Sequence, residues 1–256
     1  MTTLAGRVAI VTGGSSGLGA AALQFAREGA KVVIAARRQD ESEAVVREIE
    51  RLGGEGLFIR TDVARHADIA AMVEGTLARF GRLDCAVNNA GIAGPVTVPV
   101  AEIEEAAWDQ LMEINLKGVF LCMKYQIPAM LKQGKGAIVN VSSIYGLKPG
   151  DVGNAPYCTS KFGVIGLSKT AAIDYGQQGI RVNVVSPGFT HSEMVDAFGD
   201  AAPDLLRTLV NRYSGQNRLG AAEEIAEAIT WLCSDAARFV NGAVLAVDGG
   251  DTARLY

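Results

Sequence analysis

Short apolar runs alternate with helical segments along the whole chain, and this alternation constrains the fold more than any other feature. Several of the helical segments end at a glycine, which often closes a helix. Unbroken alternation of strands and helices is typical of α/β proteins with a parallel sheet. We therefore expect a single doubly wound α/β domain, with a seven-stranded parallel sheet flanked by helices on both faces. The expected strands are residues 8–11, 31–35, 56–61, 83–87, 137–141, 180–185 and 243–247.

The length and composition are compatible with one domain. The chain has 256 residues, of which 49% are hydrophobic, so it can bury a sizeable core. We expect a single domain over residues 1–256. Apolar residues mix with acids and prolines at about 190–214. We interpret this segment as a helical lid over a pocket; a surface excursion or an oligomer contact is the alternative.

Charge and cysteine patterns exclude several functional classes. The formal net charge is −4 and there is no basic run, so nucleic acid is not an expected partner. The four cysteines are widely spaced and there are only two histidines, so we expect neither a metal site nor disulfides. No apolar run approaches the ~18 residues of a membrane span, and the N-terminus lacks the charged region of a signal peptide. We expect a cytoplasmic protein without membrane contacts.

A glycine-rich loop follows the first expected strand. It reads Thr12-Gly13-Gly14-Ser15-Ser16-Gly17-Leu18-Gly19, and an alanine-rich helix over residues 20–28 comes next. Strand, glycine loop and helix together present a helix N-terminus and bare backbone N–H groups, which suit a phosphate. The spacing is neither Gly-x-Gly-x-x-Gly nor that of a P-loop. The segment therefore predicts a phosphate site, without fixing the class of nucleotide.

The residues after the second expected strand bear on the choice of nucleotide. An acid at this position commonly holds the ribose 2′-hydroxyl of NAD. Here the strand is followed by Ala36-Arg37-Arg38. An arginine can bind a 2′-phosphate through charge-assisted hydrogen bonds. The sequence thus favours NADP, with Arg37 as the first choice of ligand and Arg38 as the second; the alternative is that one or both arginines merely cap the strand and face water.

A tyrosine and a lysine lie four residues apart near the start of a helix that we expect to run to about residue 175. Tyr157 and Lys161 would share one face of that helix. A phenol has a pKa near ~10, and a neighbouring cation lowers it. The pair could then move a proton on and off an alcohol oxygen; a solvated helix face is the alternative. Asn115 lies inside a long helical stretch, 106–132, where asparagine is unfavourable and indicates a kink or a buried polar role.

With these motifs in this order, the chain resembles the short-chain dehydrogenase/reductase family from end to end. The matching segments are Thr12-Gly13-x-x-x-Gly17-x-Gly19, Asp62-Val63, Asn88-Asn89-Ala90-Gly91, Asn115, Ser143, Tyr157-x-x-x-Lys161 and Pro187-Gly188. The resemblance implies a single Rossmann-type, doubly wound domain with a nucleotide-binding half at about 1–92 and a catalytic half at about 93–256. It also implies an oxidoreductase that transfers a hydride between NADP(H) and a ketone/aldehyde–alcohol pair. By this resemblance Tyr157 would be the general acid/base, and Lys161 would lower its pKa and hold the nicotinamide ribose. Ser143 would orient the substrate oxygen, and Asn115 would fix the kink and a water of the proton relay.

The resemblance also implies a cofactor site and its alternatives. The family often has threonine where Ser192 stands, and NADP-preferring members often carry a basic residue where this loop has Ser15 and Ser16, which weakens the NADP assignment. An NAD-dependent alcohol or polyol dehydrogenase of the same family is one alternative. A non-catalytic nucleotide-binding sensor or scaffold is another. The cofactor residues would be Gly13, Ser15, Ser16, Gly17, Leu18, Gly19, Arg37, Arg38, Asp62, Val63, Asn89, Ala90, Gly91, Tyr157, Lys161, Pro187, Gly188, Thr190 and Ser192.

The sequence does not identify the substrate beyond a small carbonyl or alcohol compound. The segments expected to line its pocket, at 92–98, 144–154 and 189–213, are mostly apolar. Lys148 and Arg212 could bind a carboxylate or phosphate, or could be surface charges. Members of the family are mostly tetramers, and the resemblance implies a homotetramer that pairs through the helices around Asn115 and Tyr157.

Overall fold

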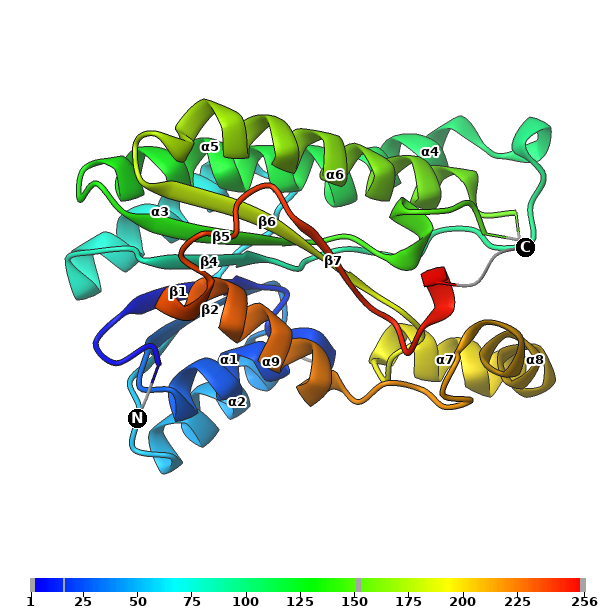
Figure 1. The fold of residues 1–256 in the computed structure, drawn as a ribbon, viewed down its shortest axis with the longest axis horizontal. Helices are drawn as coiled ribbons and strands as arrows, with labels where there is room; N and C mark the ends of the chain where they lie inside the picture. Colours follow the sequence, from blue (N-terminus) through cyan, green and yellow to red (C-terminus); the bar gives the residue numbers. More distant parts are fainter. Residues whose placement is uncertain (1–2, 16, 151–152, 254–256) are drawn as a thin grey trace.

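The computed structural model describes residues 3–15, 17–150 and 153–253, and its centre is a parallel sheet in the order β3-β2-β1-β4-β5-β6-β7 (Figure 1). The predicted Rossmann-type fold class is therefore confirmed. The observed strand bounds differ from the expected ones by one or two residues. They are β1 (Val8–Thr12), β2 (Lys31–Ala36), β3 (Gly56–Arg60), β4 (Cys85–Asn88), β5 (Gly136–Val141), β6 (Ile180–Pro187) and β7 (Val244–Val247).

Helices cover both faces of the sheet, and each layer buries its own apolar cluster (Figure 1). Side chains alternate along a strand, so Ala9 and Val11 face one cluster and Ile10 faces the other. This two-sided burial explains why the strands are continuous apolar runs. One layer holds α1 (Ala20–Arg27), α2 (Gln39–Arg51) and α9 (Ala222–Cys233); the other holds α3 (His66–Phe80), α5 (Gly118–Leu131) and α6 (Ala155–Gly176).

The order of the strands reverses between β1 and β4, which are neighbours in the sheet. The chain proceeds outward from β1 to β2 and β3, and then returns to place β4 on the other side of β1. Loops leaving the two neighbouring strands diverge at such a switch point, and ligands bind in the resulting crevice beyond the carboxyl ends of the strands. The glycine loop and the segment Asn88-Asn89-Ala90-Gly91 both begin at this point.

The helical stretch expected at 106–132 is divided in the structure. It consists of α4 (Glu105–Met112), a π-helical turn (Glu113–Lys117) and α5. Such turns often occur at functional sites. Asn115 lies in the π turn and is fully buried, so the irregularity expected at this residue takes the form of a widened turn.

The segment expected to form a lid contains two helices, α7 (Glu193–Ala201) and α8 (Pro203–Tyr213). The Ser192 hydroxyl caps α7 by accepting a hydrogen bond from the backbone N–H of Val195 at 3.2 Å. Pro203 occupies the first turn of α8, where its missing N–H costs nothing. Their role as a lid stays a prediction. None of the helices in the described part of the chain is both long and apolar enough to cross a membrane.

Candidate active site

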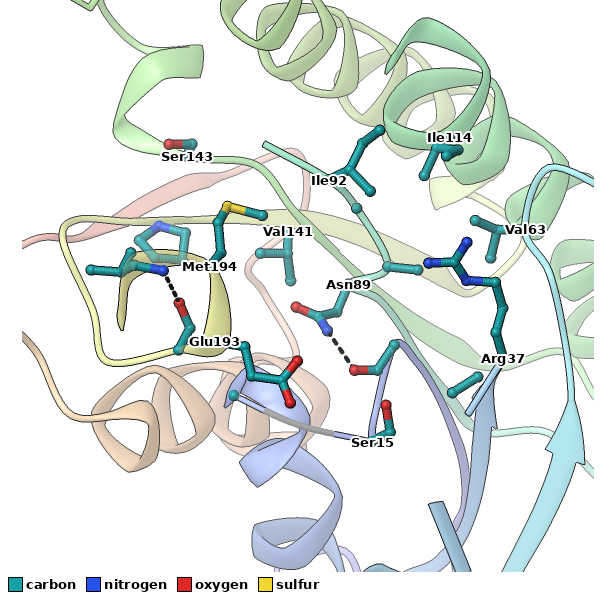
Figure 2. A pocket seen from close by; sticks show the side chains of 18 of the residues that line it. Ser15, Arg37, Val63, Asn89, Ile92, Ile114, Val141, Ser143, Glu193 and Met194 are labelled. Atoms are coloured by element: carbon teal, nitrogen blue, oxygen red, sulfur yellow. Dashed lines mark hydrogen bonds between the residues drawn. The ribbon is translucent and has the colours of Figure 1, made fainter. Parts of the chain in front are cut away.

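A cavity of about 410 Å³ opens beyond the carboxyl ends of the strands, at the switch point of the sheet (Figure 2). Its walls come from the glycine loop, the ends of β2, β4, β5 and β6, the helix α6 and the start of α7. Most of the residues assigned from the sequence line it. They are Gly13, Ser15, Gly17, Arg37, Arg38, Asp62, Val63, Asn89, Ala90, Gly91, Ser143, Tyr157, Lys161, Pro187, Gly188, Thr190 and Ser192.

A few assigned residues do not line the cavity, and others line it without having been assigned. Asn115 lies behind the wall, and Gly19 is the last residue of a 3-10 turn (Gly17–Gly19) within the glycine loop. Ser16 and the side chain of Leu18 lie outside the described part of the chain. Glu193, which the sequence analysis gave no role, lines the cavity from the first turn of α7. Its position next to the assigned Ser192 was the signal that could have revealed it.

Lys161 is a buried cation at the closed end of the cavity. Its side chain emerges from α6, and the residue is only 5% exposed. The ammonium donates a hydrogen bond to the Val141 carbonyl at 3.0 Å and lies 5.5 Å from the centroid of the Tyr157 ring. Burial lowers the pKa of Lys161 to about 8, because desolvation disfavours the charged form.

Tyr157 lies beside this cation, but its pKa differs from the sequence-based expectation. Burial raises the pKa of the phenol, while a hydrogen bond with Ser143 opposes that effect. Desolvation outweighs the hydrogen bond with Ser143 and decides the direction of the shift. A phenol held in its protonated form is suited to donate a proton.

Two consecutive serines follow β5 and make different contacts. The Ser143 hydroxyl accepts a hydrogen bond from the Tyr145 backbone N–H at 3.2 Å and also contacts Tyr157. The Ser142 hydroxyl instead donates to the Lys161 carbonyl at 2.9 Å and ties α6 to the end of β5. A Cβ atom on Gly146 would lie 2.3 Å from the Ser142 oxygen, so this close approach requires glycine. Of the two serines, Ser143 has the geometry to meet a substrate beside Tyr157.

Asn115 holds the loop that follows β4. Its amide donates to the Ile92 carbonyl at 2.9 Å, and its carbonyl oxygen accepts from the Ile92 N–H at the same distance. A Cβ atom on Gly91 would lie 3.1 Å from the Asn115 oxygen and 3.7 Å from the Lys161 ammonium. The π turn therefore fixes the loop wall directly against the buried lysine.

The glycine loop packs closely against the segments that follow β4 and β6. Gly13 has a φ of +66°, and a Cβ atom there would lie 2.9 Å from Ala90. Gly17 has a φ of +53°, and its Cβ would lie 3.1 Å from the Cβ of Ser192. No described side chain caps the N-terminus of α1. The N–H groups at a helix N-terminus are suited to bind an anion. These features fit the pyrophosphate of a dinucleotide.

The two arginines after β2 have different surroundings. Arg37 is exposed and extends toward Val63 and the Asn89 loop (Figure 2). Arg37 makes no hydrogen bond or ion pair with the residues that the structure describes. Arg38 instead holds both carboxylate oxygens of Glu193, at 3.0 Å each, and donates to the Ser15 hydroxyl at 3.2 Å.

Two aromatic rings pack next to Tyr157, and a buried ion pair holds the loop that follows β5. The Tyr145 ring packs edge-on against Tyr157, with centroids 6.5 Å apart, and against Phe189 at 6.3 Å. The Lys148 ammonium pairs with the Asp251 carboxylate, and their side chains are only 13% and 2% exposed. Lys148 is therefore not the surface charge that the sequence left open. The pair joins the loop after β5 to the segment after β7.

Comparisons with known proteins agree with this architecture. A family model described as Enoyl-(Acyl carrier protein) reductase matches residues 13–252. The chain is 45% identical to the A-factor type gamma-butyrolactone 1′-reductase (1S-forming) of Streptomyces virginiae, over 97% of this chain and 96% of that protein. It is 43% identical to cis-4-hydroxycyclohexanecarboxylate dehydrogenase of Sinomonas cyclohexanicum, over 96% and 97%. The solved structure of levodione reductase superposes with a TM-score of 0.94 at 35% identity and covers 98% of this chain and 100% of that chain.

The fold, the cavity and these relatives together define an NAD(P)-dependent oxidoreductase that acts on alcohol- or ketone-type groups. The chain belongs to the short-chain dehydrogenase/reductase family, as the order of its motifs predicted.

Proposed function

We propose that this enzyme transfers a hydride between NADP(H) and a ketone–alcohol pair, with Tyr157 as the general acid and base. The observation that carries the proposal is the group at the closed end of the cavity. There the Tyr157 phenol contacts the Ser143 hydroxyl and lies beside the buried Lys161 ammonium. This group combines a proton donor, a hydroxyl that can orient a carbonyl oxygen, and a cation that favours negative charge on oxygen.

The residues divide the work of reduction as follows. The bound nicotinamide supplies the hydride to the carbonyl carbon. Tyr157 donates its proton to the carbonyl oxygen, and the raised pKa of the phenol keeps that proton in place beforehand. Ser143 holds the oxygen near the phenol, and Lys161 favours the phenolate that remains. Asn115 fixes the loop wall that Lys161 faces. In oxidation the phenolate takes the proton of the alcohol.

The choice of NADP rests on the open end of the cavity, where the exposed Arg37 lies. Arg37 extends into the cavity and contacts no described acid, so its guanidinium is available to a 2′-phosphate. The end of β2, where NAD sites commonly carry an acid, has Ala36 instead. The glycine loop would hold the pyrophosphate, and Asp62 and Val63 would border the adenine. An NAD-dependent dehydrogenase of the same family is the second candidate.

For the substrate we propose a ring-bearing ketone or secondary alcohol. The Tyr145 ring packs against Tyr157, and the Phe189 ring packs against Tyr145; this aromatic cluster next to Tyr157 suits a compact apolar ring. The names of two relatives contain a butyrolactone and a hydroxycyclohexanecarboxylate, so ring-bearing substrates are a reasonable starting set. The buried Lys148 is already paired, which argues against its use as a reader of substrate charge.

We also infer a homotetramer in the cytoplasm. Large apolar side chains are exposed on two helices that cover one face of the sheet, and burial in an oligomer would remove them from water. They are Phe120 on α5, and Phe162 and Ile173 on α6. Sedimentation of the wild type and of Phe162→Glu tests this inference. A tetramer that dissociates in the variant supports it, and a monomeric wild type rejects it.

A titration with NADPH and NADH tests the choice of cofactor. We expect NADPH to bind the wild type more tightly, and Arg37→Ala to lose about tenfold in NADPH affinity with little change for NADH. Arg47→Ala removes an exposed arginine of α2 that does not line the cavity, and it serves as the control. Turnover of cyclic ketones and alcohols with the preferred nucleotide then tests the reaction. Equal or tighter binding of NADH would select the NAD-dependent alternative.

A further inference from the structure

At the open end of the cavity, an acidic side chain already binds the guanidinium of Arg38. Glu193, the first residue of α7, places its two carboxylate oxygens 3.0 Å from the two terminal nitrogens of Arg38. The Ser15 hydroxyl lies 3.2 Å from one of the same nitrogens. Glu193 projects into the cavity opposite Ser15 (Figure 2). The Arg38 guanidinium therefore connects Glu193 of α7 to Ser15 of the glycine loop.

The contact has the form that an arginine offers to a phosphate. A guanidinium fork binds two oxygens of a carboxylate or of a phosphate in the same parallel arrangement, and a serine hydroxyl adds a further donor. Ser15 and Arg38 both line the cavity beside Arg37. The Glu193 carboxylate therefore occupies donors that would otherwise suit a phosphate on the ribose.

We propose that Glu193 is a specificity-determining residue, because its carboxylate competes with the 2′-phosphate of NADP(H) for Arg38. The inference rests on the proposed binding of a nicotinamide dinucleotide in this cavity. Occupation of Arg38 lowers the affinity for NADP(H) and leaves NAD(H), which has a hydroxyl at this place, nearly unaffected. Repulsion between the carboxylate and the phosphate acts in the same direction.

The exposure of the pair sets the size of the effect. The side chains of Arg38 and Glu193 are 42% and 60% exposed, and exposed ion pairs are weak. A phosphate carries more charge than a carboxylate and can displace it. Removal of the competitor should therefore raise affinity for a 2′-phosphate by at most about fivefold. Glu41 also faces Arg38, at the longer distance of 3.8 Å, and should compete less.

Two adenine nucleotides without nicotinamide isolate the phosphate. Adenosine 2′,5′-bisphosphate and AMP are titrated calorimetrically against the wild type, Glu193→Gln and Asp196→Asn. Asp196 lies in the first turn of α7 and contacts His191, so its variant removes one negative charge from the same helix without touching Arg38. We expect Glu193→Gln to tighten the bisphosphate about threefold to fivefold and to change AMP less than about twofold. Asp196→Asn should change the ratio of the bisphosphate affinity to the AMP affinity by less than Glu193→Gln does.

The same titrations with Arg38→Gln and with the double variant Arg38→Gln/Glu193→Gln complete a double-mutant cycle. The gain from Glu193→Gln should shrink when Arg38 is absent, because interacting residues are not additive. The inference is overturned if Glu193→Gln leaves the ratio of the two affinities unchanged or weakens the bisphosphate. NADPH and NADH titrations separate this result from the proposed function. A wild type that prefers NADH rejects the NADP assignment but still predicts the shift in Glu193→Gln, whereas a wild type that prefers NADPH with no shift rejects only the role of Glu193.

Discussion

The two ends of the cavity differ in how their charges are held. At the closed end, Lys161 is 5% exposed, bonds to a backbone carbonyl and has a pKa lowered to about 8. At the open end, Arg38 and Glu193 form an ion pair whose side chains are roughly half exposed. Desolvation makes a buried charge costly, so its surroundings must be specified closely, whereas an exposed charge can change partners at little cost.

This difference suggests a division of labour. The closed end carries the proposed chemistry, which requires fixed distances between the phenol, the hydroxyl and the ammonium. The open end selects the nucleotide, and modest changes in charge there can tune affinity without disturbing the fold. Substitutions at the closed end should therefore have large effects on rate or stability, and substitutions at the open end should have small ones.

The largest effect is expected for Tyr157→Phe. Loss of the proposed general acid should lower kcat by about 10²- to 10⁴-fold, while the affinity for the nucleotide stays nearly unchanged. Stopped-flow measurement of hydride transfer and nucleotide titration check the two parts. Tyr145→Phe is the matched control, because its ring packs 6.5 Å from that of Tyr157. A Tyr157→Phe variant that retains most of its rate would remove Tyr157 from the mechanism.

The second-largest effect is expected on the free energy of unfolding, in the variant Lys148→Met. The variant leaves the carboxylate of Asp251 buried without its cation, and no described group binds the second oxygen of that carboxylate. Breaking a buried pair from one side costs roughly 3–5 kcal/mol of unfolding free energy. Chemical denaturation measures this. The double variant Lys148→Met/Asp251→Leu should recover most of the loss, and a single variant as stable as the wild type would contradict the assigned burial.

Several features of the closed end of the cavity could be predicted from the local sequence. Continuous apolar runs gave the buried strands, and the four-residue spacing placed Tyr157 and Lys161 on one helical face. The direction of the tyrosine pKa did not follow, because it depends on desolvation by the folded chain. The asparagine at 115 signalled an irregular helix, but its partner Ile92 is 23 residues away.

Long-range side-chain pairs explain most of what the sequence left open. Lys148 and Asp251 are 103 residues apart, and Arg38 and Glu193 are 155 residues apart. No local pattern indicates such partners, since each charge alone is equally suited to a solvated surface. The cofactor residues were found because they cluster at strand ends, whereas Glu193 enters the cavity from a helix whose packing depends on the complete fold.

A smaller effect, dependent on pH, is expected at Lys161. Its folded pKa of about 8 lies below the ordinary value of 10.5. Between these values the unfolded chain binds more protons, so stability rises with pH, and the full penalty is present below pH 8. Lys161→Met should therefore be more stable than the wild type by roughly 1–3 kcal/mol at pH 7, after the lost bond to Val141 is counted. This advantage should shrink as the pH rises from 8 toward 10.5.

Thermal or chemical unfolding of both proteins across that range checks the sign. Lys169→Met, which removes an exposed lysine of the same helix, controls for the loss of a positive charge. An advantage of Lys161→Met that grew with pH would show that burial does not depress the pKa of this lysine.

The smallest effect is expected for Arg38→Gln, which breaks the ion pair at the open end. The pair is bidentate, as is common for strong arginine–carboxylate contacts, but both side chains remain largely in water. Water replaces the lost bonds, so the free energy of unfolding should change by less than about 1 kcal/mol. The same denaturation assay used for Lys148→Met gives a direct comparison of the two ion pairs. A loss as large as that of Lys148→Met would mean that α7 depends on Arg38 for its position, and the open end would then be as closely specified as the closed one.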